Sequence, residues 1–245
     1  MPELMTKEEM IAEIAPFEAG YVPCEETQAD IGQADIVTIT GMRGVGKDTS
    51  RKATPFWLSR SMASRDIRLE DGEIDGVDYD FLKRADYPAI VVAVRQKKLV
   101  QFAIYQDEFY GTMPTAYSHE KPSIIDVVYD QVEPVRVLPF RSCVSTYLTS
   151  RDYDTWRHRW AGRGYMEPKK VEASLVEAKD SLEWGLGHDY VRVIMNDTID
   201  QCVTDIRHVV EDPERYTPAQ ELLARNAAAG ILRQLKIELG DPVSV

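Results

Sequence analysis

Residues 36–49 read IVTITGMRGVGKDT, a β-branched apolar run followed by closely spaced glycines, a lysine and two polar residues. The apolar run predicts a buried strand that ends at Gly41. Glycines let the loop curl until its N–H groups point inward, and the next helix adds its positive end. Lys47 can then reach the β- and γ-phosphates of a nucleotide. The predicted ATP-binding residues of this P-loop are Gly41, Met42, Arg43, Gly44, Val45, Gly46, Lys47, Asp48 and Thr49.

Asp48 departs from the usual form of this motif, in which a serine or threonine hydroxyl after the lysine binds Mg²⁺. A carboxylate is a hard oxygen ligand and can bind Mg²⁺ directly or through water. It also brings a negative charge close to the phosphates, which is unfavourable unless the metal neutralises it. We therefore interpret Asp48 as an altered metal ligand, with lost activity as the alternative.

Apolar runs and periodicities predict the remaining elements. Further strands are expected at 88–95, 99–105, 123–129, 143–148 and 191–195, and strands and turns at 60–80. Helices are expected at 6–14, 47–56 (shortened or kinked by Pro55), 79–85, 152–159, 169–184, 199–210 and 218–239, and a loop at 16–30. Strands that alternate with helices on apolar runs indicate an α/β fold, with a parallel sheet covered on both faces.

The composition narrows the classes of partner. The chain has 245 residues, and 29 basic against 41 acidic residues give a net charge of −12. This balance argues against general binding to nucleic acid or to anionic membranes, although a local arginine cluster can still bind a nucleotide. Three widely spaced cysteines indicate free thiols. Because no apolar run could span a membrane and the N-terminus lacks a signal peptide, we expect a cytoplasmic protein.

Three further stretches carry candidate phosphate ligands. Arg65 and Arg68 lie three residues apart in a polar stretch, where two guanidinium groups can clamp a phosphate or simply form a solvated pair. The run 109–112, read as an aromatic turn beside a glycine, offers tyrosine and threonine hydroxyls. Arg159 and Arg163 lie near glycines, which suits a mobile lid, although arginines also complement a helix C-terminus. The four histidines show no zinc-ligand spacing with the cysteines.

In their order and spacing these motifs resemble the guanylate kinase family over roughly residues 36–210. The pattern comprises the P-loop, Ser61-x-x-x-Arg65-x-x-Arg68, residues 72–79 (GEIDGVDY), residues 110–112 (YGT), Asp126, Arg159 with residues 162–164 (GRG), and residues 195–197 (MND). The resemblance implies a three-layer P-loop NTPase fold with an NMP-binding subdomain at about 60–120 and a lid at about 157–175. The guanylate kinase-like domain would occupy residues 36–212, between an N-terminal extension (1–35) and a C-terminal helix (213–245).

The resemblance also implies roles for individual residues. Lys47, Arg159 and Arg163 would be catalytic, and Asn196 would lie near the adenine of ATP. The residues expected to bind the acceptor are Ser61, Arg65, Arg68, Tyr79, Gln101, Tyr110, Thr112 and Asp126. ATP and Mg²⁺ are the implied cofactors, and a nucleoside monophosphate is the implied acceptor.

Three departures keep the acceptor open. Gln101 stands where the family has a glutamate that reads guanine, and a carboxamide accepts one hydrogen bond where a carboxylate accepts two. Ser174 stands in place of a phosphate-binding arginine, and Asp48 follows the P-loop lysine. Asp48 resembles the aspartate that follows the P-loop lysine in ribose 1,5-bisphosphate phosphokinase, and Arg65-Asp66 resembles the Arg-Asp pair of that enzyme.

The leading hypothesis is therefore an ATP-dependent, Mg²⁺-requiring kinase of GMP or dGMP. The alternatives are a ribose 1,5-bisphosphate phosphokinase, which would act on a phosphorylated sugar, and a catalytically inactive guanylate-kinase-like binding module. Residues 1–35 and 213–245 either cap the core or form a homodimer contact.

Overall fold

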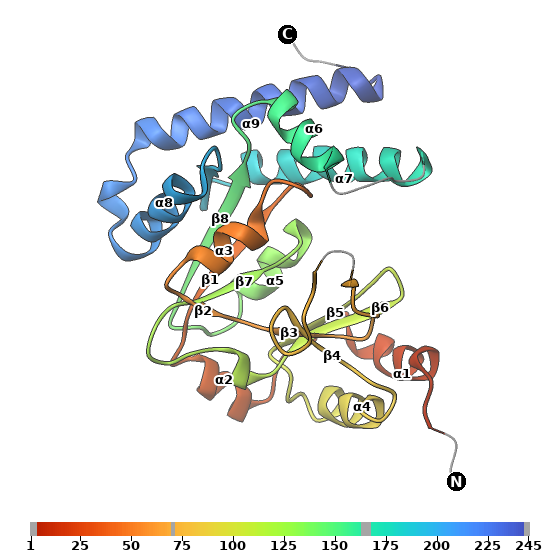
Figure 1. The fold of residues 1–245 in the computed structure, drawn as a ribbon. Coiled ribbons are helices and arrows are strands. Elements are labelled where there is room, and N and C mark those ends of the chain that lie inside the picture. Colours follow the sequence, from red (N-terminus) through yellow and green to blue (C-terminus); the bar gives the residue numbers. More distant parts are fainter. Residues whose placement is uncertain (1–3, 70–71, 163–167, 243–245) are drawn as a thin grey trace. The chain divides into compact units, whose positions relative to one another are not determined.

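The structure is a computed structural model that describes residues 4–69, 72–162 and 168–242. The chain divides into two compact units (Figure 1). Unit 1 contains residues 1–36, 57–123 and 135–142, and unit 2 contains residues 37–56, 124–134 and 143–245. Each unit is therefore assembled from three separate segments of the chain.

Strand order defines two sheets. The first has five strands in the order β2-β7-β1-β8-β9, with β8 and β9 paired in parallel. Its strands are β1 (Asp35–Gly41), β2 (Trp57–Leu58), β7 (Ser123–Asp126), β8 (Ser142–Thr149) and β9 (Val191–Met195). The second, within unit 1, has four strands in the order β4-β3-β6-β5. They are β3 (Ser61–Ala63), β4 (Tyr79–Phe81), β5 (Gln101–Tyr105) and β6 (Glu108–Thr112).

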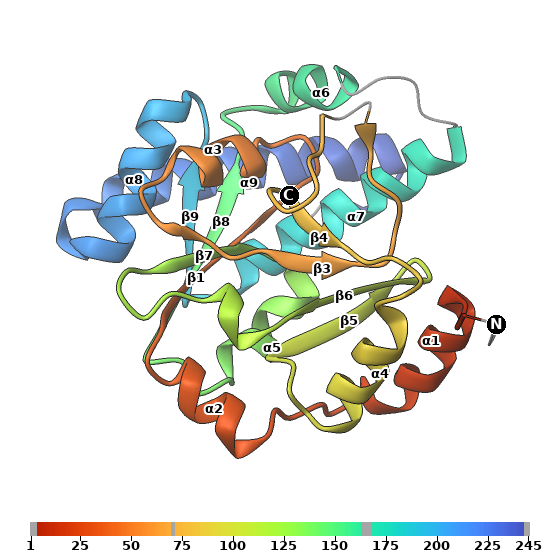
Figure 2. The ribbon, with the colours of Figure 1, turned by 60° about the horizontal axis from the view of Figure 1, so that its bottom comes forward.

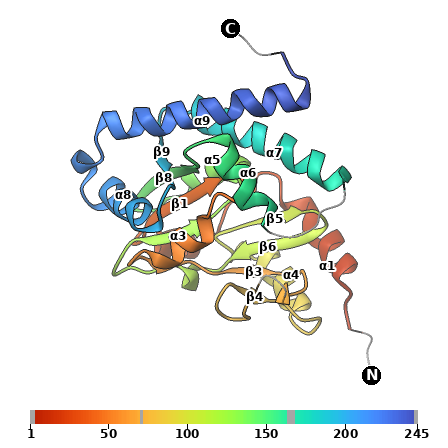
Figure 3. The same ribbon diagram turned by 45° about the horizontal axis from the view of Figure 1, so that its top comes forward.

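Helices of unit 2 surround β8 and β9. They are α3 (Lys47–Ala53), α6 (Tyr153–Ala161), α7 (Pro168–Gly187), α8 (Ile199–Glu211) and α9 (Pro218–Leu239). The long helices α7 and α9 lie side by side (Figure 3) and bury Leu182 and Ile231 against Val191 and Val193 of β9. On the other side α8 contacts both β9 and α3 (Figure 2). This arrangement confirms the predicted α/β fold with helices on both faces.

Unit 1 buries one face of its four-stranded sheet. Its helices are α1 (Lys7–Ile14), α2 (Glu25–Ile31) and α4 (Tyr87–Arg95). Phe102 and Phe109 pack with Met10 of α1 and Val91 of α4, which lie on the same side of β5 and β6 (Figure 2). A two-residue turn at 106–107, with positive φ at both positions, joins β5 to β6.

Short 3₁₀ helices and one short α-helix complete the described part of the chain. They are η1 (Ala15–Phe17), η3 (Pro114–Ala116), η4 (Tyr129–Gln131), η5 (Pro213–Arg215) and α5 (Val132–Arg136). None of the helices in the described residues is long and apolar enough to cross a membrane.

Four of the expected elements are wrong. Residues 88–95 form helix α4, residues 79–81 form strand β4 where a helix was expected, and residues 109–112 belong to strand β6 where a turn was expected. The expected loop at 16–30 contains most of η1 and nearly all of α2. In α4 the buried side chains are Tyr87, Ile90, Val91 and Val94, a helical spacing, and Pro88 occupies the first turn, where its missing N–H has no cost.

Candidate functional site

The P-loop connects β1 to α3 and requires its glycines. Gly41, Gly44 and Gly46 have φ values of 141°, 83° and 96°, a region that L side chains rarely adopt. A Cβ on Gly41 would stand 2.5 Å from the carbonyl oxygen of Leu148. The loop can therefore hold this tight curve only with glycine at these positions.

Lys47 begins α3, and its ammonium folds back over the loop. Nζ donates a hydrogen bond to the carbonyl oxygen of Gly41 at 2.7 Å and a longer one to that of Met42 at 3.4 Å. The side chain is half-buried. The structure thus places the predicted catalytic cation against the first two carbonyl oxygens of the P-loop.

The Asn196 side chain supports the P-loop through hydrogen bonds. Its Nδ2 donates to the carbonyl oxygen of Val45 at 2.8 Å and to the hydroxyl of Ser50 at 3.2 Å, and the residue is buried. A Cβ on Gly46 would stand 2.6 Å from this Nδ2. The side chain therefore helps to shape the P-loop, while its predicted position near adenine stays a prediction.

Helix α6 adds two more contacts beside the loop. Trp156 donates its Nε1–H to the carbonyl oxygen of Arg43 at 2.9 Å. Arg159, a predicted catalytic residue, donates from Nη1 to the carbonyl oxygen of Asn196 at 2.6 Å and from Nη2 to that of Asp197 at 2.8 Å. The guanidinium is thereby tied to the residue that braces the P-loop. The second predicted lid arginine, Arg163, lies outside the described residues.

Asp48 and Thr49 are exposed on the first turn of α3. The Asp48 side chain is 57% exposed, and its Oδ1 lies 3.6 Å from Nη2 of Arg51. In the described part of the chain no group of three or more metal-ligating side chains is present. A single exposed carboxylate beside a phosphate-binding loop fits the way in which kinases bind Mg²⁺, through one or two carboxylates plus phosphate oxygens. It does not fit a metal site built from protein ligands alone.

A second cluster of predicted residues lies in unit 1, on one face of the four-stranded sheet. Ser61 pairs with Tyr79 across β3 and β4, and Gln101 pairs with Thr112 across β5 and β6. Tyr110 pairs with Ala63 and Ala103, which places it on the same face by the two-residue alternation of strands. The opposite face carries Phe102 and Phe109 and packs on the core. Five of the eight predicted acceptor-binding residues thus share one surface.

Arg65 leaves the end of β3 and is almost fully buried over this face. Its guanidinium lies 4.9 Å from the ring centre of Tyr79 and 5.1 Å from that of Phe81. Glu73 pairs with it through two hydrogen bonds of 2.6 and 2.7 Å. Burial alone would raise the pKa of Glu73, but the hydrogen bonds from Arg65 and from the Arg68 amide outweigh it and lower that pKa.

Gln101 belongs to a short hydrogen-bonded chain. Its Nε2 lies 3.5 Å from Oγ1 of Thr112, a long contact, and that hydroxyl is 2.9 Å from the hydroxyl of Tyr117. Burial raises the pKa of Tyr117, so this phenol stays neutral and able to donate. The Gln101 carboxamide is therefore directed toward Thr112 through its nitrogen.

Two predicted acceptor-binding residues, Arg68 and Asp126, are not among those that share the sheet face. Arg68 has an exposed side chain, and its backbone N–H donates to Glu73 at 2.9 Å. Asp126 ends β7 and belongs to unit 2. Glu73 lies within the motif at residues 72–79, but that motif by itself predicts no role for its side chain.

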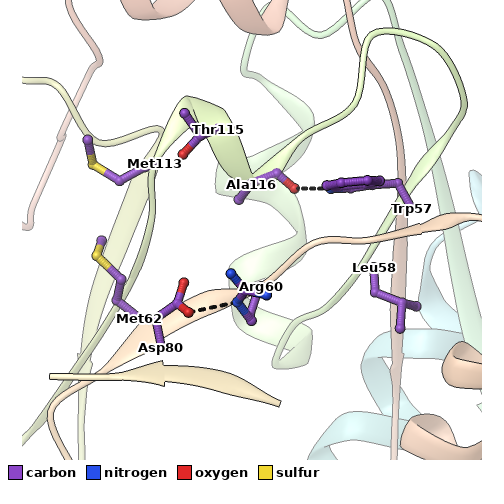
Figure 4. Close-up of a pocket in the computed structure, with 8 residues that line it drawn as sticks. All are labelled: Trp57, Leu58, Arg60, Met62, Asp80, Met113, Thr115 and Ala116. Atoms are coloured by element: carbon purple, nitrogen blue, oxygen red, sulfur yellow. Dashed lines mark hydrogen bonds and ion pairs between the residues drawn. The ribbon is translucent and has the colours of Figure 1, made fainter. Parts of the chain in front are cut away.

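A small cavity of about 110 Å³ lies elsewhere in unit 1 (Figure 4). An ion pair between Arg60 and Asp80, 2.7 Å long, lines it together with Trp57 and Met62. Met62 and Asp80 alternate with Ser61 and Tyr79, so they point away from the acceptor face. None of the predicted site residues lines this cavity.

Comparison with known proteins decides the family. The family model described as guanylate kinase matches residues 34–213. The chain belongs to the guanylate kinase family. Guanylate kinases of Listeria innocua and Listeria monocytogenes are each 31% identical over 186 residues, which cover 72% of this chain and 87% of the relative. The crystal structure of guanylate kinase from Anaplasma phagocytophilum shares the fold with a TM-score of 0.50 and 16% identity, over 86% of this chain and 97% of that one.

Membership of the guanylate kinase family identifies the reaction class. The chain is a nucleoside monophosphate kinase, and such kinases use ATP with Mg²⁺. The predicted ATP-binding loop lies in unit 2, and most of the predicted acceptor-binding residues lie on the polar sheet face of unit 1.

Proposed function

We propose that the chain transfers the γ-phosphoryl group of ATP to GMP or dGMP. The observation that carries the proposal is the sheet face of unit 1, where Ser61, Tyr79, Tyr110 and the buried Arg65 gather polar and cationic groups around one surface. A nucleotide's phosphate suits Arg65 and the tyrosine hydroxyls. Its base suits the end of the face that carries Gln101 and Thr112.

The NMP-binding part of the chain is then residues 60–120, and residues 157–175 form the lid. Asp126 faces the base, and Arg68 assists Arg65 with the acceptor phosphate. Residues 1–35 and 213–245 flank the catalytic domain of residues 36–212. We place the enzyme in the cytoplasm, in keeping with the free thiols of Cys24, Cys143 and Cys202.

Catalysis rests on positioning and charge stabilisation, with no covalent intermediate. Loop N–H groups and the Lys47 ammonium hold the β- and γ-phosphates, and the acceptor phosphate oxygen attacks in line. Negative charge then grows on the bridging and peripheral oxygens, where Lys47, Arg159 and Arg163 stabilise it. Asp48 would hold Mg²⁺ together with the phosphate oxygens, and the ion neutralises their charge.

The test is a coupled assay of ADP release with ATP, Mg²⁺ and a panel of acceptors. The panel contains GMP, dGMP, IMP, AMP, CMP, UMP and ribose 1,5-bisphosphate. We expect turnover that is fastest with GMP or dGMP. Turnover with the sugar alone would favour the phosphokinase alternative, and an absence of turnover with every acceptor would favour an inactive binding module.

A further inference from the structure

The pair between Arg65 and Glu73 uses only part of the arginine. Nη1 donates to Oε2 of Glu73 at 2.7 Å, and Nη2 donates to Oε1 at 2.6 Å. The carboxylate therefore occupies the end-on edge of the guanidinium, formed by the two terminal nitrogens. Both side chains are shielded from water, with 9% and 14% of their surfaces exposed.

Two N–H donors of the Arg65 guanidinium are not used by Glu73 or Asp66. A guanidinium has five N–H bonds. Glu73 takes two, and the carbonyl oxygen of Asp66 takes the second hydrogen of Nη1 at 2.9 Å. The remaining two, on Nε and Nη2, point in the same direction and form the side-on edge, which can bind two oxygens of one phosphate. In the described part of the chain, no protein group accepts a hydrogen bond from this edge. No nitrogen of Arg65 is both buried and without a hydrogen-bond partner there.

The plane of the guanidinium is also fixed. It is stacked near the rings of Tyr79 and Phe81, at 4.9 and 5.1 Å. Glu73 in turn accepts the backbone N–H of Arg68 at 2.9 Å. One carboxylate thus orients Arg65 and anchors the backbone of the second arginine of the motif.

We propose that Glu73 is a positioning residue for the acceptor's phosphate: it holds the end-on edge of Arg65 so that the side-on edge faces the phosphate. This inference rests on the proposed function, since it assumes that Arg65 binds the acceptor. It differs from a simple ion pair because it assigns the two edges of one guanidinium to two different anions.

The opposite role for Glu73 predicts the opposite result. A carboxylate that competes with phosphate for Arg65 would weaken acceptor binding, and its removal would strengthen it. A positioning carboxylate strengthens acceptor binding. Without it, Arg65 would be mobile in the free protein, and binding would carry the entropic cost of ordering this side chain. The sign of the change in acceptor affinity therefore separates the two roles.

The experiment measures binding of GMP and of guanosine by calorimetry, together with KM and kcat for GMP, in the full-length chain. Glu73→Gln keeps the shape but replaces one acceptor by an N–H group that faces the guanidinium. We expect the Kd and KM for GMP to rise by at least about tenfold, because charge-assisted hydrogen bonds are lost, and kcat to fall less. Guanosine, which lacks the phosphate, should bind the variant and the parent equally. Glu73→Asp should restore part of the GMP affinity.

Asp80→Asn is the matched control. It removes another arginine–carboxylate pair of unit 1, that with Arg60, on the side away from the acceptor residues. We expect unchanged GMP affinity. Guanosine binding reports whether unit 1 of each variant is folded, and calorimetric binding of ATP does the same for the loop of unit 2.

A double-mutant cycle gives the decisive outcome. If Glu73 acts through Arg65, Glu73→Gln should change GMP affinity less than about twofold in an Arg65→Ala background. An equal loss in both backgrounds, or a gain of affinity in Glu73→Gln alone, would overturn the inference. Failure of the parent chain to bind any nucleoside monophosphate would instead overturn the proposed function, so the two failures are distinguishable.

Discussion

Replacing Asn196 by aspartate tests whether this side chain shapes the P-loop. The two side chains have nearly the same volume, so no cavity is created. The substitution replaces Nδ2, which donates to the carbonyl oxygen of Val45 at 2.8 Å, by an acceptor oxygen. Two oxygens would then face each other at that distance, with no hydrogen between them at neutral pH.

The magnitude follows from burial. Asn196 is 4% exposed, so the Val45 carbonyl loses its partner in a place that water does not reach freely. An unpaired buried acceptor costs about 1–3 kcal/mol, which is the loss expected for Asn196→Ala. Asn196→Asp should cost more at pH 7, because the carboxylate is desolvated as well. Arg159 contacts this segment, but its recorded hydrogen bonds already go to two main-chain carbonyls.

The assay is urea unfolding of parent, Asn196→Ala and Asn196→Asp at several pH values, with the exposed change Asp197→Asn as control. Desolvation raises the folded-state pKa of the introduced carboxyl above its unfolded value of about 3.9. The protonated form can donate to Val45, so the variant should recover stability as pH falls toward that value and lose it as pH rises through the folded pKa. An Asn196→Asp variant as stable as the parent at pH 7 would refute the bracing role.

Three other changes address the site and the fold. Lys47→Ala should abolish ADP release while leaving the unfolding midpoint nearly unchanged; undiminished rates would mean that the P-loop is not the site. Gln101→Glu should raise the ratio of kcat/KM for GMP over IMP by about tenfold, because a carboxylate accepts from both donors of guanine; an unmoved ratio would contradict the assignment of the base. Hydrogen bonds from Arg141 lower the pKa of Asp35 against the opposing effect of burial. Asp35→Asn should therefore lose stability at pH 7, and the difference from the parent should shrink below about pH 3.9; a difference that is constant with pH would rule out this linkage.

The sequence was a good guide where patterns are local. The strand before the P-loop, the end of α3 at Ala53 and the closing helices α8 and α9 agree with the structure. The expected strand at residues 88–95 is wrong because a short apolar run fits a buried strand and a buried helix equally. Only the packing of α4 against α1 and the sheet decides between them.

The candidate site was predictable as a set of residues and less so as an arrangement. Motif order identified Arg65, Tyr79 and Tyr110, which the structure places on or over one face. The sequence does not predict the contact of Glu73 with Arg65, because no local pattern marks it. The resemblance predicts a position for Asn196 near adenine, whereas its contact with Val45 depends on a tertiary fold that motif spacing does not reveal.

The bond between Asn196 and Val45 joins residues 151 positions apart. At a synthesis rate of about 5–20 residues per second, the ribosome needs about 8–30 s to add the brace after the loop has been made. The nascent chain therefore carries a complete phosphate-binding motif long before it carries the groups that give the motif its shape. The bond that supports the loop can therefore form only late in synthesis, and a chain released before residue 196 would carry the motif without that support.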